Sequence, residues 1–199
     1  MSNSETLSFG EFVRLVLDAL EAAEIPYLIG GAVALAAWGE ARTTRDLDLV
    51  IDLPLESMAS FSRELEKRDM LVPVEVMLDL IIESRADLPI NAIHMFSGYK
   101  AEFFLLKPGD AFREANFERR RLVDFGPPLG EVFVHAPEDL ILNKLHFYAI
   151  SHQPKHIRDI ASIVLSQEDA LDYDYIDAWA ERLGLTVIWQ EVIARIRGK

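Results

Sequence analysis

Apolar positions follow two different periods along this 199-residue chain, and the period changes from segment to segment. From residue 12 to residue 23 they recur every three or four positions, directly after Ser8-Phe9-Gly10-Glu11, which has the spacing of a capping box. This predicts an amphipathic first helix. Tyr27 to Ile29 and Asp46 to Ile51 are short apolar runs, which predict two strands separated by an alanine-rich helix over residues 32–38.

The middle of the chain mixes both periods. Pro54 is placed to open a helix, and residues 74–85 fit either period, so we interpret them as a helix. Residues 90–96 and 99–106 flank Ser97-Gly98, which predicts a hairpin. A second hairpin is expected from residues 120–125 and 131–135, and Pro137 opens a helical region that continues to the end of the chain.

Strands and helices are therefore interleaved without repeats or long linkers, which indicates an α+β fold with a mixed sheet flanked by helices and a C-terminal helical part. The turn-forming run Lys107-Pro108-Gly109-Asp110 marks a plausible boundary. We expect residues 1–108 to form a core, and residues 109–199 to form a mixed strand and helical part packed on it.

Composition narrows the range of functions. With 20 basic and 33 acidic residues the net charge is −13, which opposes broad nonspecific binding to DNA or RNA. The absence of cysteine excludes disulfides, thiolate metal sites and cysteine nucleophiles, and fits a reducing compartment. The first residues lack the pattern of a signal peptide and no apolar run approaches the ~20 residues that span a bilayer, so we expect a cytoplasmic protein without a membrane partner.

Charge is unevenly distributed. Residues 140–158 contain no Asp or Glu. They contain basic side chains that predict a local anion-facing patch, although solvated helix faces would have the same composition. The three histidines of this segment, His146, His152 and His156, lack the spacing of a zinc site, and we expect them at the surface. The residues concerned are Lys144, Lys155, Arg158, His146, His152 and His156.

Candidate chemistry is concentrated between residues 27 and 51. Gly30-Gly31 lies where a strand passes into a helix, and unpaired backbone N–H groups at such a point suit a phosphate. Asp46 and Asp48 lie two residues apart on a strand and therefore project from one face. Two carboxylates on an apolar strand are costly unless a cation joins them, and oxygen ligands favour Mg²⁺.

The order of these features resembles the nucleotidyltransferase superfamily that shares the fold of DNA polymerase beta. Arg42-x-Thr44-x-Asp46-x-Asp48 looks like the branch that contains the toxin half of abortive-infection-type toxin–antitoxin pairs. The resemblance implies a nucleotidyltransferase-like sheet with the catalytic core in residues 1–108. It also implies two Mg²⁺ ions held by Asp46 and Asp48.

The same resemblance requires a third carboxylate on a neighbouring strand. Glu102 is the natural candidate because it is acidic within a strand-like apolar run, although the family usually has aspartate there. It would bind metal and accept the proton of the attacking hydroxyl. The alternative is that Glu102 is an ordinary polar residue on a strand, without a catalytic role. Arg42 and Arg45 precede the carboxylates and offer planar groups suited to phosphates; Arg42 could instead pair with an acidic side chain.

A distal segment extends the likeness. Glu138-Asp139-Leu140, Lys144-Leu145 and Arg158-Asp159-Ile160 resemble a pattern of toxin-type nucleotidyltransferases. It implies that Lys144 points towards the triphosphate, with Arg158 and Asp159 also in the nucleotide site and Asp159 orienting either Lys144 or a neighbouring base. A lysine that extends along its helix to solvent is the alternative. Ser162 departs from the pattern, which often has a second aspartate there.

These features predict an Mg²⁺-dependent nucleotidyltransferase that moves a nucleoside monophosphate from an NTP to an acceptor hydroxyl. The family context implies the toxin of a toxin–antitoxin pair that acts on tRNA or other RNA and has a cognate antitoxin as its partner. A small-molecule, antibiotic-type acceptor is an alternative, for which the acidic charge would suit cationic substrates. A nucleotide-binding or partner-binding module without turnover is the third hypothesis.

Overall fold

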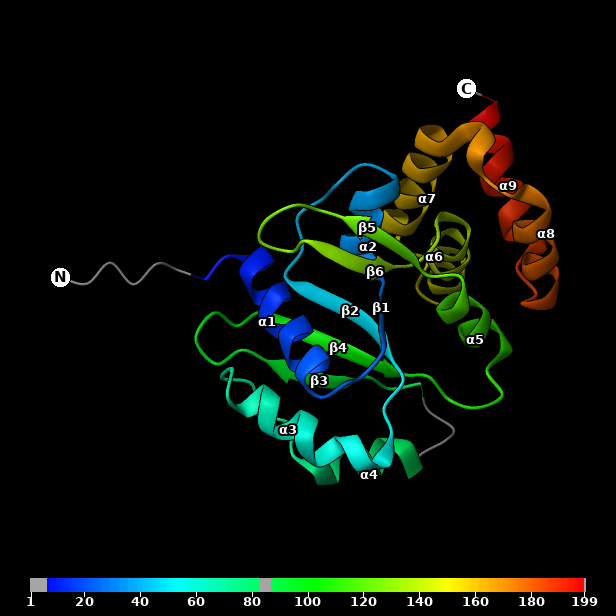
Figure 1. Ribbon diagram of the computed structural model, residues 1–199. Coiled ribbons are helices and arrows are strands. Elements are labelled where there is room, and N and C mark those ends of the chain that lie inside the picture. Colours follow the sequence, from blue (N-terminus) through cyan, green and yellow to red (C-terminus); the bar gives the residue numbers. More distant parts are fainter. Residues whose placement is uncertain (1–6, 83–86, 199) are drawn as a thin grey trace.

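The computed structural model describes residues 7–82 and 87–198. Its centre is a six-stranded mixed sheet with the strand order β3-β4-β2-β1-β6-β5 (Figure 1). The sheet and the helices around it confirm the expected α+β class. In chain order the strands are β1 (Tyr27–Ile29), β2 (Asp46–Ile51), β3 (Ile90–Ile93), β4 (Lys100–Leu105), β5 (Arg121–Asp124) and β6 (Glu131–Val134).

The strand directions bring distant segments together. β3 and β4 form one predicted hairpin and β5 and β6 form the other, both antiparallel. β2 lies between β1, with which it is antiparallel, and β4, with which it is parallel. β1 also pairs in parallel with β6, where Ile29 lies opposite Val134. The carboxyl ends of β1 and β6 therefore meet at one edge of the sheet.

The helices begin and end largely where the pattern predicts. Ser8 and Glu11 form the expected capping box, and residues 74–82 are helical as interpreted, while residues 83–85 of that prediction lie outside the described residues. The helices are α1 (Phe9–Ala22), α2 (Gly31–Trp38), α3 (Met58–Glu66), α4 (Val74–Ile82), α5 (Ala111–Glu118), α6 (Pro137–Ser151), α7 (Pro154–Gln167), α8 (Tyr173–Arg182) and α9 (Thr186–Arg197), with short 3-10 turns at Leu55–Ser57 and Glu168–Ala170.

The two faces of the β2–β4 pair have opposite character. Leu47, Leu49 and Phe103 point to a fully buried face, where the Phe103 ring meets Phe61 of α3 edge-on at 5.3 Å between centroids. Because side chains alternate along a strand, the other face carries Asp46, Asp48 and, on β4, Glu102. The α3 and α4 helices lie on the opposite side of the molecule from α6 to α9 (Figure 1).

The second half of the chain continues the sheet of the first. β5 and β6 extend it beyond β1, and α6 packs against α2, α7 and α8. The predicted division at residue 108 stays a prediction. Among the helices described, none combines the length and apolar character needed to cross a membrane.

Candidate active site

The Gly30-Gly31 turn carries the carboxylate of Asp48. Gly30 is the N-cap of α2, and its N–H donates to the backbone oxygen of Asp48 at 2.8 Å. Gly31 has φ +57°, and a Cβ built on it would overlap Asp48 Oδ2 and lie 2.7 Å from Asp48 Cγ. Only glycine fits this position, because the aspartate side chain occupies the space directly beside the start of the helix.

Three carboxylates line up on this face of the sheet. Asp48 lies directly opposite Glu102 in the parallel β2–β4 pair, and Asp46 lies one pleat away. Burial, followed by the nearby charge of Glu102, raises the pKa of Asp48 to about 6. Crowding of like charges at a half-buried position is the kind of arrangement that a bound cation relieves.

A lysine already sits among these carboxylates. Lys100 of β4 lies opposite Asp46, and its Nζ is 2.6 Å from Glu102 Oε1 and 3.6 Å from Asp46 Oδ1. The hydrogen bond to Glu102 raises the pKa of Lys100 above its usual range. In this arrangement an ammonium group supplies the positive charge between Asp46 and Glu102. Sequence reasoning missed Lys100, which reaches the carboxylates only because β2 and β4 pair in this register.

The donor set suits a hard divalent cation. Asp46, Asp48 and Glu102 offer carboxylate oxygens from adjacent strands, which is the ligand type of Mg²⁺. Within residues 7–82 and 87–198, no three His, Cys, Asp or Glu side chains are already gathered as the ligands of one ion. The carboxylates therefore fit a divalent cation in chemistry, and in this structure Lys100 supplies positive charge beside Asp46 and Glu102.

Lys144 faces this carboxylate group from α6. It is buried, and its Nζ is 2.8 Å from Asp159 Oδ2, so the reading of Lys144 as a lysine extended to solvent is wrong. Burial lowers the pKa of Lys144, and the hydrogen bond to Asp159 opposes that shift. Arg42 Nε also contacts Asp159, at 3.3 Å. Asp159 therefore pairs with both Lys144 and Arg42, and the nucleotide-binding roles expected for these three residues stay predictions.

A cavity of about 320 Å³ connects these parts. It runs from the Gly30-Gly31 turn across β2 and β4 to α6 and the start of α7. Of the residues expected from the sequence, it is lined by Gly30, Gly31, Arg42, Asp48, Glu102 and Lys144. Asp46 does not line it, and Asp159 lines a neighbouring depression. Arg45 is elsewhere, 5.1 Å above the Tyr99 ring with a hydrogen bond to Ser97 O. Arg158 lines a separate depression beside Arg42. Other residues that line the cavity include Val50, Phe104, His135, Leu140, Asn143, Lys155 and His156.

His135 and Asn143 are cavity residues that the sequence analysis did not single out. His135 follows β6, its backbone N–H donates to Ile29 O at 3.0 Å, and its ring packs on Gly30. Burial lowers the pKa of His135 to about 4, so the ring is neutral at pH 7. Its Nδ1 has no hydrogen-bond partner among the described residues. The only signal for His135 in the sequence was its position at a predicted strand end.

The expected surface histidines divide into two kinds. His146 and His152 are exposed, as predicted, but His156 is buried against Phe147, with ring centroids 6.1 Å apart and nearly parallel planes. Burial lowers the pKa of His156 to about 4. The expectation for His156 was wrong because Phe147, one turn beyond Lys144 on α6, covers it.

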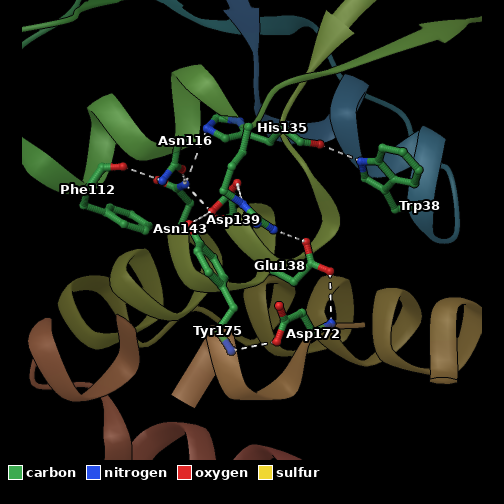
Figure 2. Close-up of polar contacts among 10 residues, drawn as sticks. Trp38, Phe112, Asn116, His135, Glu138, Asp139, Asn143, Asp172 and Tyr175 are labelled. Carbon is green, nitrogen blue, oxygen red and sulfur yellow. Dashed lines mark hydrogen bonds and ion pairs between the residues drawn. The ribbon is translucent and has the colours of Figure 1, made fainter. Parts of the chain in front are cut away.

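A buried ionic group anchors α6 beneath the cavity. Arg119 Nη2 is 2.9 Å from Glu138 Oε2, and Arg119 Nε is 3.3 Å from Asp139 Oδ2. The hydroxyl of Tyr175 on α8 donates to Asp139 Oδ1 at 2.6 Å, and Figure 2 shows this contact beside the helix. The first turn of α6 is thereby tied to α8 and to the residue after α5. This holds the helix that carries Asn143 and Lys144.

Ser162, where the family pattern often has an aspartate, has a local structural role. Its Oγ donates to Asp159 O at 2.9 Å and accepts from Glu40 N at 3.3 Å. Gly39 lies so close that a Cβ there would be 2.6 Å from Ser162 Oγ. The serine therefore joins the end of α2 to α7 at a contact that a longer carboxylate side chain would not fit without adjustment.

Comparison with known proteins gives structural matches alone. No family model and no curated protein matches the chain. The crystal structure of ANT(2'')-Ia in complex with adenylyl-2''-tobramycin aligns with a TM-score of 0.60 at 14% identity, covering 87% of this chain and 95% of that chain. This protein has the nucleotidyltransferase fold. The solution structure of the antibiotic-resistance factor ANT(2'')-Ia aligns with a TM-score of 0.56 at 14% identity, covering 95% of both chains.

The nucleotidyltransferase fold extends over both halves of the chain, because the aligned share includes nearly all of it. At this level of identity the likeness concerns the fold, and the toxin branch expected from Arg42-x-Thr44-x-Asp46-x-Asp48 receives no support from these matches. Because one fold can host many functions, the function of this protein depends on the residues in the cavity.

Proposed function

We propose that this protein is a nucleotidyltransferase that moves a nucleoside monophosphate from an NTP to an acceptor hydroxyl with the help of Mg²⁺. The observation that carries the proposal is the Asp48 carboxylate seated on Gly31, opposite Glu102 and facing Lys144 across one cavity. This combines a helix start suited to phosphate, oxygen ligands for a cation and a buried ammonium group in one place.

Each residue has a distinct task in this mechanism. The N–H groups at the start of α2 and the Lys144 ammonium would hold the phosphates, and Asp159 keeps that ammonium in place. Asp46, Asp48 and Glu102 would bind Mg²⁺, which supplies charge neutralisation at the α-phosphorus and activates the acceptor hydroxyl. Glu102 would accept the proton of that hydroxyl while pyrophosphate leaves. The protein acts mainly by positioning and by charge, without a covalent intermediate.

Two kinds of acceptor are supported by different observations. The fold match to a protein whose structure contains adenylyl-2''-tobramycin, together with the net charge of −13, favours a cationic small molecule with a hydroxyl group. Lys155 at the cavity and Arg158 in the depression beside Arg42 favour the end of an RNA, as a toxin acting on tRNA would require. We place the small-molecule acceptor first because the overall acidic charge opposes a long RNA.

A labelling assay tests both parts of the proposal. The protein is incubated with each α-labelled NTP and Mg²⁺ in the presence of an aminoglycoside panel or of total RNA, and label transfer is measured. Asp46→Ala and Asp48→Ala should each reduce transfer by at least about a hundredfold. Asp52→Ala is the matched control, because Asp52 is exposed at the far end of β2 and should retain full transfer.

The outcomes separate the hypotheses. Label on an aminoglycoside supports the small-molecule enzyme, and label on RNA supports the toxin. Binding of NTP without transfer to either would identify a module without turnover. Circular dichroism should show both alanine variants folded, because each removes a carboxylate from a crowded group; transfer that survives either change would refute the assigned metal site.

A further inference from the structure

Two asparagines beside the cavity form a chain of hydrogen bonds with a fixed direction. Asn116 of α5 is 1% exposed, and its Nδ2 donates to Phe112 O at 2.6 Å. A carbonyl oxygen can only accept, so the Asn116 amide cannot be reversed, and its Oδ1 must face Asn143. Asn143 accordingly presents Nδ2, which donates to Asn116 Oδ1 at 2.7 Å (Figure 2).

A second contact supports the same orientation of Asn143. Its Nδ2 also donates to Asp139 O at 2.8 Å, which again accepts only. The two hydrogens of Nδ2 are thus used, and the 3.5 Å approach to His135 Nε2 is at the limit of a hydrogen bond. Asn143 lines the cavity with its side chain partly exposed, and Oδ1 makes no hydrogen bond within the described part of the chain. The atom left for the cavity is therefore an acceptor with an orientation set by the protein.

The place of this acceptor identifies the group it would meet. Asn143 is next to His135, whose ring packs on Gly30, and it precedes Lys144 on the same helix. The acceptor is thus one side chain away from the proposed phosphate site. The group attached to the α-phosphate of a nucleotide is its sugar. The same cavity is also lined by the apolar side chains of Val50, Phe104 and Leu140, which suit the uncharged part of a nucleotide.

We propose that Asn143 Oδ1 accepts a hydrogen bond from a sugar hydroxyl of the bound NTP and that Asn116 is the positioning residue that keeps this oxygen turned to the cavity. The inference rests on the proposed function and deepens it, because it makes the protein selective for nucleotides with that hydroxyl. An acceptor held by two hydrogen bonds cannot rotate to suit an analogue that lacks the donor.

Equilibrium binding tests this directly on the whole protein. Dissociation constants are measured by calorimetry for each NTP, its 2'-deoxy and 3'-deoxy analogues, and inorganic tripolyphosphate. One deoxy analogue should bind about tenfold more weakly than the NTP. Asn143→Ala should weaken the NTP about tenfold, remove the discrimination and leave tripolyphosphate binding unchanged. Asn91→Ala removes an exposed amide that donates to Pro89 O and should change none of these constants.

Asn116→Ala distinguishes positioning from mere packing. Without Asn116 Oδ1, only the hydrogen bond to Asp139 O still orients the Asn143 amide, so the amide can turn more readily and discrimination should fall while tripolyphosphate still binds. Equal binding of the NTP and both deoxy analogues to the unmodified protein would overturn the inference, as would discrimination that survives Asn143→Ala. Neither result would affect the proposed function, whereas failure of both NTP and tripolyphosphate to bind would overturn both.

Discussion

Replacing Gly31 by alanine should perturb the fold and the site at one point. The backbone there has φ +57°, and the new Cβ would overlap Asp48 Oδ2 and approach Asp48 Cγ to 2.7 Å. The atoms in the way belong to a carboxylate held between β2 and α2. We expect Gly31→Ala to push this carboxylate away from the helix start, so that it no longer lies beside Glu102.

The loss of stability expected from Gly31→Ala has two parts. A left-handed backbone costs an alanine about 1–2 kcal/mol, and an overfilled site typically costs about 1–3 kcal/mol more. Gly31→Ala should therefore lower the free energy of unfolding by about 2–5 kcal/mol. Gly184→Ala separates the two parts, because Gly184 has φ +69° with no atom within 4 Å of the added Cβ, and it should lose only the backbone part.

Urea denaturation of a double-mutant cycle gives the steric part directly. In an Asp48→Ala background Oδ2 and Cγ are gone, and the added Cβ meets the remaining Cβ of residue 48 at 3.1 Å. The cost of Gly31→Ala should then fall to about 1–2 kcal/mol, close to that of Gly184→Ala. The reasoning would be refuted if Gly31→Ala cost no more than Gly184→Ala, or if its cost were the same with and without the Asp48 side chain.

Two further predictions concern buried groups around α6. The pKa of His135 falls from about 6.5 in the unfolded chain to about 4 on folding, so the neutral ring favours the folded state fully above pH 6.5 and this stability is lost as the pH falls. In urea titrations between pH 7 and pH 5, the free energy of unfolding of the unmodified protein should fall by about 2 kcal/mol more than that of His135→Gln. Parallel pH dependence of the two proteins would disprove the assignment. Tyr175→Phe removes the hydroxyl that donates to the buried Asp139 carboxylate and should lower the free energy of unfolding by about 1.5–3 kcal/mol. The control Tyr173→Phe should have little effect, because the Tyr173 hydroxyl is exposed and 3.4 Å from Glu168 O. Equal losses of stability in the two variants would contradict the role of the buried network.

Local patterns predicted much of the secondary structure because their causes are local. The capping box at Ser8, the helix start at Pro137 and the turn at Ser97-Gly98 each depend on residues within a few positions of one another. The Gly-Gly turn and the same-face aspartates also follow from spacing along one strand and one helix. These features were sufficient to anticipate the fold class and the position of Asp48 beside the glycine turn.

The residues that were missed or misassigned depend on contacts between different strands or different helices. His135 meets Gly30 only because β6 lies parallel to β1, and strand order is set by the packing of the whole sheet. Lys100 reaches Glu102 and Asp46 through the β2–β4 register. His156 is buried because α6 and α7 fold against each other and bring Phe147 over it.

The sequence by itself determined the helices, the strands and the pair of aspartates that follow a glycine turn, since these arise from periodicity and backbone preference within short segments. Tertiary structure alone decided that Lys144 is buried against Asp159 and that Asn143 is turned by Asn116, because each pairing joins side chains on two different helices that must first pack together. The physical reason is that a side chain's burial and its hydrogen-bond partners are properties of the packed molecule, and burial sets charge and orientation in the cavity.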